Sequence, residues 1–416
     1  MSTLPPEIMD AIVYLLSNEM HTLKNLSLVC SAWLPSTRFY LFGTIRVKLL
    51  SIHSLSALAF HSQSTFTGYV KAIEIDGMWK LLEQESAWVD ILSIDKSITR
   101  LATALPSLKT FRLHNIDFED VSKHVSEMLV SSITSAFSNV REIELEGIIF
   151  VSVSQVMHLI SGFRFLKKFT GSNLVWEDPS HEDESRVHSY CVPSTLVELS
   201  LDACYKRDIM ACLSSHIPFP VIPRLNFGII SPEDCEAYGQ YIRRLGPGLF
   251  SLSLGFHSLD AGGDAEDFYK ACDLCHATEL FSIHFSRLVW YWDYRLTSPT
   301  PWIAKILSKI SSPRFEEISF DIHISNLSQI HSERLPDDYD WSSLDVALDG
   351  LPERLPSFRL VTFFIYVVSG SPSLLSAKDT LKSVLPLSSH RRILRFKTFL
   401  DRTNEGPLVP SLQLDY

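Results

Sequence analysis

The stretch Leu249 to Leu254, LFSLSL, carries the pattern that decides the fold. Its first, fourth and sixth residues are apolar. In a β-strand, successive side chains alternate between the two faces, so the fourth and sixth residues share one face and the third and fifth share the other. The same pattern appears in Leu196 to Leu201 (LVELSL) and in Leu280 to Phe285 (LFSIHF). Each stretch is therefore predicted to be a strand with one buried face and one open face.

This pattern recurs along most of the chain, which indicates internal repeats. The first residues of the successive stretches are Val70, Leu108, Val140, Leu166, Leu196, Ile222, Leu249, Leu280, Phe315, Phe358 and, weakly, Arg391. Their separations, by subtraction of residue numbers, run from 26 to 43. Most fall near or slightly above the leucine-rich-repeat period of roughly 20–29 residues. The longer separations mark insertions.

Patterns typical of helices fill most of the gaps between these strands. The predicted helices span residues 117–137, 152–163, 207–217, 231–245, 264–276, 298–311, 341–351 and 373–385. A unit of one strand and one helix leaves an apolar face that the next unit must cover. We therefore expect an irregular α/β solenoid with a parallel sheet on its concave face. Leu360 and Phe364 occupy outward positions of their strand, which indicates a strand covered on both faces.

The segment Leu4 to Phe42 differs from these repeats. Three short helices are predicted over residues 7–17, 21–33 and 38–42, and Pro35 is expected to end the second. Chains shorter than about 50 residues rarely fold alone without a staple or a partner. The segment should therefore be stabilised by the rest of the chain and by another protein.

Three blocks of this segment resemble the F-box in the form common among fungal F-box proteins. They are Leu4 to Ile8 (LPPEI), Leu28 to Trp33 (LVCSAW) and Tyr40 to Phe42 (YLF), in the order and spacing of that family. The resemblance implies docking to the Skp-type adaptor of an SCF (Skp–cullin–F-box) ubiquitin ligase and, through it, to a cullin scaffold. The family-type adaptor-binding positions are Leu4, Pro5, Ile8, Leu26, Val29 and Trp33. The alternative is a small helical cap on the downstream domain.

The rest of the chain is similar to the divergent leucine-rich repeats that often follow a fungal F-box. That family usually has Asn or Cys eight residues after the first strand residue, and here only Cys204 fits. The turns should therefore be irregular. We expect an F-box domain at residues 1–46 and a leucine-rich-repeat-like solenoid at 47–416.

Composition narrows the classes of function. The 416 residues are 46% hydrophobic and 20% charged, which is typical of an ordered protein. A net charge of −11 argues against nucleic acid as the main partner, because phosphate binding needs a basic surface. The sequence has no apolar run near the roughly 18–20 residues that span a bilayer. Seven scattered cysteines fit reduced thiols in the cytoplasm or nucleus.

The sequence shows no set of catalytic residues. Serine-hydrolase, Walker and zinc-protease motifs are missing. Cys272-x-x-Cys275-His276 matches the pattern of c-type haem attachment, but it lies in a predicted helix and no export signal precedes it. Buried helix cysteines are the preferred interpretation. We therefore expect no enzyme, metal or cofactor.

Two groups of residues are candidates for binding a target protein. Glu142, Glu144 and Glu146 predict an acidic patch on the open face, close to Glu74 and Asp76, that steers a basic ligand. An ordinary solvated strand face is the alternative.

The second group is Trp292 and Tyr294, within the aromatic run Trp290 to Tyr294. Aromatic side chains often dominate the energetics of interfaces. The alternative is packing beneath a turn.

The chain is thus expected to be a non-catalytic substrate-recognition subunit of an SCF-type ligase that binds an unknown protein target. The alternatives are an adaptor-bound interaction scaffold without a role in ubiquitination, or an enzyme framed by the repeats.

Overall fold

The structure, a computed structural model, describes residues 4–77, 87–118, 123–176, 190–256, 259–289, 297–324, 340–368 and 374–401. The chain forms two compact units, Met1–Val221 and Ile222–Tyr416. Repeated strand and helix segments build both units, as the recurring strand pattern predicts.

The first unit begins with helices α1 (Pro6–Leu15), α2 (Met20–Leu26) and α3 (Leu34–Phe42), and with the short 3-10 helix η1 (Ser31–Trp33). Both α1 and α2 pack on α3. Among these four elements, only Val13, Leu23 and Thr37 are buried. The helices therefore have a very small core of their own.

Two predictions for this segment are wrong. The helix predicted over 21–33 is divided, because Ser27 Oγ donates to the Lys24 carbonyl at 2.6 Å and Cys30 adopts an extended conformation. Such side-chain bonds offer the backbone an alternative to continuing the helix. Pro35 does not end a helix but lies in the first turn of α3. A proline is tolerated there because an N–H group in the first helical turn has no hydrogen-bond acceptor within the helix.

Six parallel strands of the first unit pair in chain order. They are β1 (Thr44–Lys48), β2 (Ala72–Asp76), β3 (Thr110–His114), β4 (Glu142–Phe150), β5 (Lys168–Trp176) and β6 (Glu198–Asp202). Strand β1 was not predicted, although Phe42, Ile45 and Val47 fit the repeat pattern. The predicted domain boundary at residue 46 falls inside this strand.

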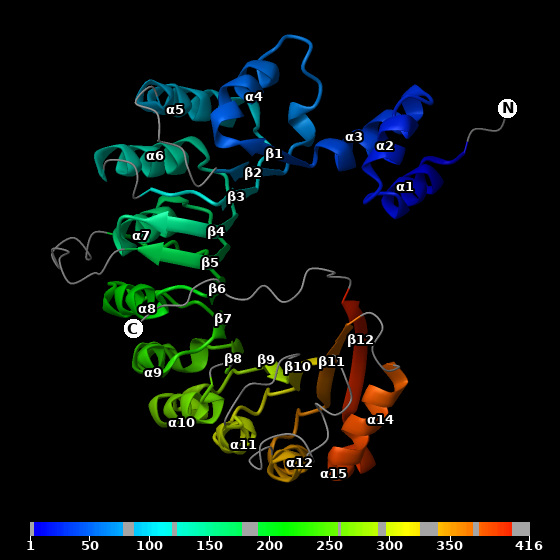
Figure 1. Cartoon of the computed structure of the whole chain (residues 1–416), viewed down its shortest axis with the longest axis vertical. Coiled ribbons are helices and arrows are strands. Elements are labelled where there is room, and N and C mark those ends of the chain that lie inside the picture. Colours follow the sequence, from blue (N-terminus) through cyan, green and yellow to red (C-terminus); the bar gives the residue numbers. More distant parts are fainter. Residues whose placement is uncertain are drawn as a thin grey trace. The chain divides into compact units, whose positions relative to one another are not determined.

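Helical segments of the first unit follow one side of its strands (Figure 1). They are η2 (Leu49–Ser51), α4 (Ile52–Ala59), η3 (Thr67–Tyr69), α5 (Ala87–Ala104), α6 (Lys123–Ala136), α7 (Val153–Gly162) and α8 (Lys206–Ser215). From α4 to α8, each α-helix packs on the next. One face of the sheet is thereby covered by helices.

The second unit repeats this plan. Its strands are β7 (Arg224–Ile229), β8 (Ser251–Gly255), β9 (Ser282–Val289), β10 (Glu317–Ile324), β11 (Leu360–Val368) and β12 (Leu394–Asp401). Its helices are α9 (Pro232–Leu245), η6 (Gly246–Gly248), α10 (Ala261–Ala271), η7 (Leu274–His276), α11 (Thr300–Ser308), α12 (Trp341–Asp349), α13 (Leu351–Arg354), α14 (Leu374–Val384) and α15 (Pro386–His390). The strands of this unit are again parallel and pair in order.

The predicted inward positions form the core of both units. Leu249, Leu252 and Leu254 are fully buried, as are most equivalent residues of the other strands. In the second unit the rings at the sixth position stack from strand to strand. Their centroids are 5.5 Å apart for Phe285 and Phe320, 5.2 Å for Phe320 and Phe363, and 5.8 Å for Phe363 and Phe396. These stacks hold adjacent repeats in register.

The prediction that the 360–368 strand is covered on both faces is only partly fulfilled. Leu360 and Phe364 are half-buried. The ring of Phe364 contacts those of His284 and Phe399, with centroids 6.2 Å and 6.3 Å away. Phe399 stands on the adjacent strand β12, and His284 stands on β9, two strands away. The cover of Phe364 therefore comes at least in part from side chains of the sheet itself.

Candidate interaction surfaces

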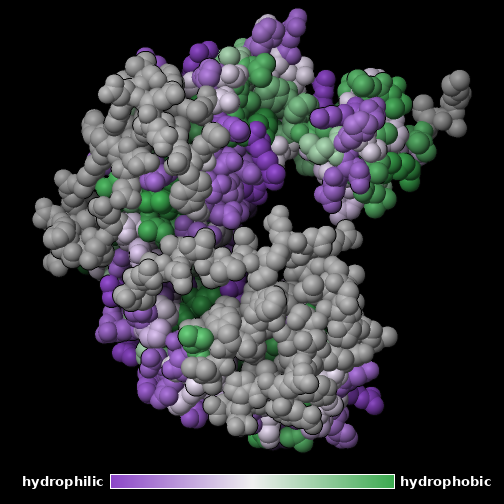
Figure 2. Space-filling model, in the orientation of Figure 1, coloured by the Kyte–Doolittle hydropathy of each residue, from purple (hydrophilic) through white to green (hydrophobic). Residues whose placement is uncertain are grey.

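The N-terminal helices expose an unusual number of large apolar side chains. We call this set the N-terminal apolar surface; its members are Leu4, Ile8, Tyr14, Leu15, Met20, Leu28, Val29 and Phe39. Figure 2 shows hydrophobic residues at the surface of these helices. Apolar surface left in water costs about 25 cal/mol per Å² of free energy relative to the same surface buried. Exposed apolar groups gathered in this way mark sites of interaction with a protein or a membrane.

The six predicted adaptor-binding residues divide into two groups. Leu4, Pro5, Ile8 and Val29 are exposed, whereas Leu26 and Trp33 are half-buried and also support the helices. Sequence reasoning missed Leu15 and Leu28, which are the most exposed members of the set. The seven-residue spacing of Ile8 and Leu15 places both on one side of α1 and was the available signal.

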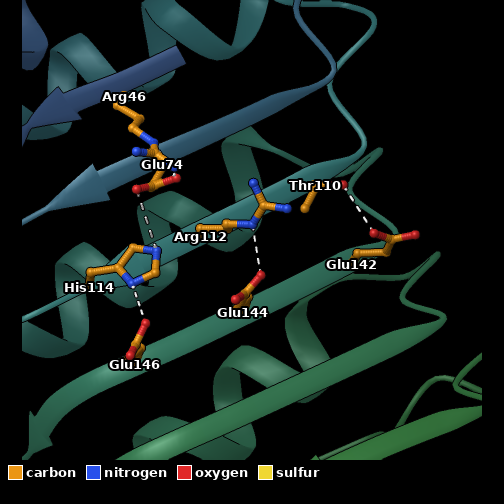
Figure 3. A network of polar contacts seen from close by, with 8 residues as sticks. All are labelled: Arg46, Glu74, Thr110, Arg112, His114, Glu142, Glu144 and Glu146. Atoms are coloured by element: carbon orange, nitrogen blue, oxygen red, sulfur yellow. Dashed lines mark hydrogen bonds and ion pairs between the residues drawn. The ribbon is translucent and has the colours of Figure 1, made fainter. Parts of the chain in front are cut away.

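The open face of the first sheet carries rows of charged side chains. We call them the charge ladder; its members are Arg46, Lys48, Glu74, Asp76, Arg112, His114, Glu142, Glu144, Glu146, Lys168, Glu198 and Asp202. In-phase pairing of the strands brings residues of opposite charge side by side (Figure 3). Arg46 Nε donates to Glu74 Oε2 at 3.0 Å, and Arg112 Nε donates to Glu144 Oε2 at 2.7 Å. On the next strands, Lys168 Nζ lies 2.6 Å from Glu198 Oε1.

Three other carboxylates of the ladder have partners other than lysine or arginine. Glu142 accepts a hydrogen bond from Thr110 Oγ1 at 3.2 Å, and Asp76 accepts one from Asn115 Nδ2 at 3.1 Å. Glu146 Oε2 lies 3.0 Å from His114 Nδ1. The ladder holds four Lys and Arg against seven Asp and Glu, a net charge of −3 with His114 neutral. The predicted acidic patch is therefore a mixed surface with an acidic excess.

A serine, a histidine and an aspartate meet on the open face of the second sheet. Ser319 Oγ lies 2.9 Å from His284 Nδ1, and His284 Nε2 lies 3.2 Å from Asp321 Oδ2. These are the residue types of a serine-hydrolase triad. However, Ser319 stands inside β10, which pairs with strands on both sides. The N–H groups of this strand are used in the sheet and cannot form the oxyanion hole that acyl transfer needs.

The other candidate sites in the sequence were the aromatic run and the Cys-x-x-Cys-His motif. Trp292 and Tyr294 lie outside the described residues. The helix predicted over 264–276 is confirmed as far as residue 271 and is wrong beyond it, because α10 ends at Ala271 and η7 follows an extended Cys272. Cys272 is buried and its thiol donates to the Cys235 carbonyl at 3.8 Å, so it does not face Cys275 as part of a haem-binding pair. Within the described residues, no helix combines the length and the apolar character needed to cross a membrane.

No family model matches this sequence, and no curated protein matches it either. Among solved structures, the fold is similar to the crystal structure of a Rad7 and Elc1 complex in yeast, with 10% identity over 89% of this chain and 87% of that chain and a TM-score of 0.39. It is also similar to the structure of a TLR13–ssRNA13 complex, with 11% identity over 81% of this chain and 39% of that chain and a TM-score of 0.36. At these values the likeness says nothing about a shared activity.

Proposed function

We propose that the chain is the substrate-recognition subunit of an SCF-type ubiquitin ligase. The N-terminal apolar surface would dock a Skp-type adaptor and, through it, a cullin scaffold. The open face of the first sheet would hold the target protein. With seven free cysteines, the protein is suited to the reducing cytoplasm or nucleus.

The N-terminal apolar surface is the observation that carries this proposal. Eight large apolar side chains are exposed between residues 4 and 39, and only three side chains of the surrounding helices are buried. Full burial of one such side chain contributes roughly 1.5–3 kcal/mol. A partner that covers several of them gains enough free energy for stable docking. The three F-box-like sequence blocks lie in this segment.

A receptor of this kind needs no nucleophile of its own. By holding a target beside the ligase's transfer module, it raises the effective concentration of the target lysine. The net charge of −3 on the charge ladder favours a target with a basic segment, because charge complementarity speeds association and selects partners.

The first experiment tests adaptor docking. The full-length chain with Leu4→Ala, Ile8→Ala and Val29→Ala should lose binding to the Skp-type adaptor and keep its thermal unfolding midpoint. These three side chains are 49–65% exposed, so their truncation removes little core. A matched control, Leu58→Ala with Val346→Ala and Leu387→Ala, truncates exposed side chains elsewhere. Equal adaptor binding by both triple variants would exclude the proposed docking surface.

The second experiment separates a receptor from an adaptor-bound scaffold. A receptor should co-purify with adaptor and cullin and support cullin-dependent ubiquitination of a trapped partner protein. A scaffold should bind the adaptor without such turnover. Adaptor binding without ubiquitination of any trapped partner would favour the scaffold.

The third experiment tests the charge of the target. A fluorescent peptide of alternating arginine and serine should bind the full chain and dissociate as salt is raised. Glu142→Gln with Glu146→Gln should weaken binding about fivefold, since an exposed ion pair contributes roughly 0.2–1 kcal/mol. The control, Glu233→Gln with Glu236→Gln, removes the same charge from exposed positions of α9. Equal losses in both variants would mean that only the overall charge matters.

A further inference from the structure

We propose that Asp273, Cys275 and His276 form a binding site for Zn²⁺, independently of the function proposed above. Within the described residues, these three side chains can bring one ligand atom each within 4.8 Å of the others. Asp273 is the N-terminal cap of the short helix η7, and Cys275 and His276 belong to that helix. This trio replaces the two-cysteine arrangement that the sequence pattern suggested.

The distances suit a small cation after modest adjustment. Tetrahedral zinc, with bonds of 2.0–2.3 Å, separates its nitrogen, oxygen and sulfur ligands by about 3.3–3.6 Å. Cys275 Sγ already lies 3.1 Å from Asp273 Oδ2. His276 is exposed, so its ring is free to turn toward the other two ligands without disturbing the core. The required closure is on the order of 1 Å, within reach of a rotamer change.

The backbone that carries these ligands is held in place before any metal binds. Asp273 Oδ1 accepts a hydrogen bond from the Cys275 N–H at 3.1 Å, which fixes the start of η7. Leu274 is buried, and Ser311 Oγ donates to the Cys275 carbonyl at 2.8 Å. Because the turn is anchored at these points, binding a cation would cost little ordering of the chain.

The ligand types select the metal. Zinc takes thiolate, imidazole and carboxylate ligands, whereas Mg²⁺ and Ca²⁺ prefer oxygen ligands alone. Three protein ligands leave a fourth position for water. The Cys275 thiol donates a hydrogen bond to Asp273 Oδ2, and metal binding would release the thiol proton to solvent as the thiolate forms.

One nearby cation opposes the site. The Lys309 ammonium acts electrostatically on both Asp273 and Cys275. Its Nζ donates to the Tyr269 carbonyl at 2.6 Å and lies 3.8 Å from the centroid of the Tyr269 ring. Its single charge is outweighed by the carboxylate together with the thiolate formed on binding.

Titration of the metal-free, reduced full-length chain with Co²⁺ tests the proposal. A site with one thiolate should give a sulfur-to-cobalt charge-transfer band that saturates at one equivalent, and Zn²⁺ should displace the cobalt. Cys275→Ser should abolish the band. His276→Gln should weaken Co²⁺ binding about tenfold or more, since even outer-shell partners are worth 10–100-fold.

Cys191→Ser is the matched control, because Cys191 is an exposed free cysteine elsewhere in the chain. It should leave the band unchanged. Absence of a saturable band, or an equal band in Cys275→Ser, would overturn the proposal. Because His276 is exposed, His276→Gln should fold normally. If Cys275→Ser fails to fold, the weaker Co²⁺ binding expected of His276→Gln still decides the test. Adaptor binding by the same variants should be unchanged, so a failed metal site would not count against the proposed receptor function.

Discussion

Replacement of Leu28 by alanine offers the sharpest test of the N-terminal apolar surface. The Leu28 side chain follows α2 and is 84% exposed. Leu→Ala removes three carbon groups, each contributing about 0.8 kcal/mol when it is fully buried by a partner. Scaled by the exposed fraction, the loss is about 2 kcal/mol. At 1.4 kcal/mol per tenfold, the Kd for the adaptor should rise about 30-fold.

The same substitution should leave the fold intact, because an exposed side chain contributes little to the core. Isothermal titration of the full-length chain with purified Skp-type adaptor measures the Kd, and thermal unfolding measures stability. The matched control is Leu58→Ala, since Leu58 in α4 is 62% exposed but lies outside the N-terminal segment. Its Kd should match that of the wild type.

Two outcomes would refute this reasoning. An unchanged Kd in Leu28→Ala, with normal stability, would show that the most exposed apolar side chain of the segment is not covered by the adaptor. An equal rise in Kd for Leu58→Ala would show that the effect is general and does not arise from one docking surface.

Two further predictions concern stability. Gly239→Ala should destabilise the chain by about 1–3 kcal/mol in urea unfolding, because its Cβ would stand 2.2 Å from the Ala271 carbonyl oxygen and overpack α9 on α10. Gly68→Ala, where a Cβ meets nothing within 4 Å, should change stability little, and equal losses would contradict this account. Burial, reinforced by nearby carboxylates, raises the pKa of Cys235 from its ordinary 9.0 to about 12. Between these two pKa values the folded chain keeps the Cys235 thiol proton that the unfolded chain loses. The contribution of Cys235 to the free energy of unfolding should therefore be complete below pH 9 and decrease as the pH rises toward 12. Cys235→Ala should show a shallower fall, and an identical pH profile would disprove this contribution.

The core of the fold was predictable because strand periodicity is local. Each predicted strand start is followed two or three residues later by a strand in the structure, and even the weak start at Arg391 gives the right register, Val361 beside Leu394. Arg391 itself is exposed and bonds Asp349 and Glu353 instead of entering the core. Gly171 breaks the apolar pattern because Leu174 fills the space that its side chain would take.

The failures share a physical cause, since they depend on contacts that local periodicity does not contain. The apolar residues of 21–33 satisfy a helical pattern, yet Leu28 and Val29 end in a turn and face solvent. Which apolar side chains of α1 and α2 stay exposed depends on how little α3 covers them. Likewise, Cys272 and Cys275 are spaced about one helical turn apart in sequence, but Cys272 adopts an extended conformation, so the two side chains lie in different surroundings.

The charge ladder was predicted only in part, although the sequence contained more information about it than was used. Thr110 pairs with Glu142, Arg112 with Glu144 and His114 with Glu146, and each pair is 32 residues apart in sequence. The predicted strand starts Leu108 and Val140 are also 32 residues apart. Residues at equal offsets in consecutive repeats therefore become neighbours, so the repeat spacing already contained the partners of all three glutamates. An acidic strand read alone predicts an acidic patch. The same strand read beside its neighbour predicts Glu142 beside a threonine, Glu144 beside an arginine and Glu146 beside a histidine. Glu142 and Glu146, whose partners on β3 are neither arginine nor lysine, are then the carboxylates that we expect a basic target to meet.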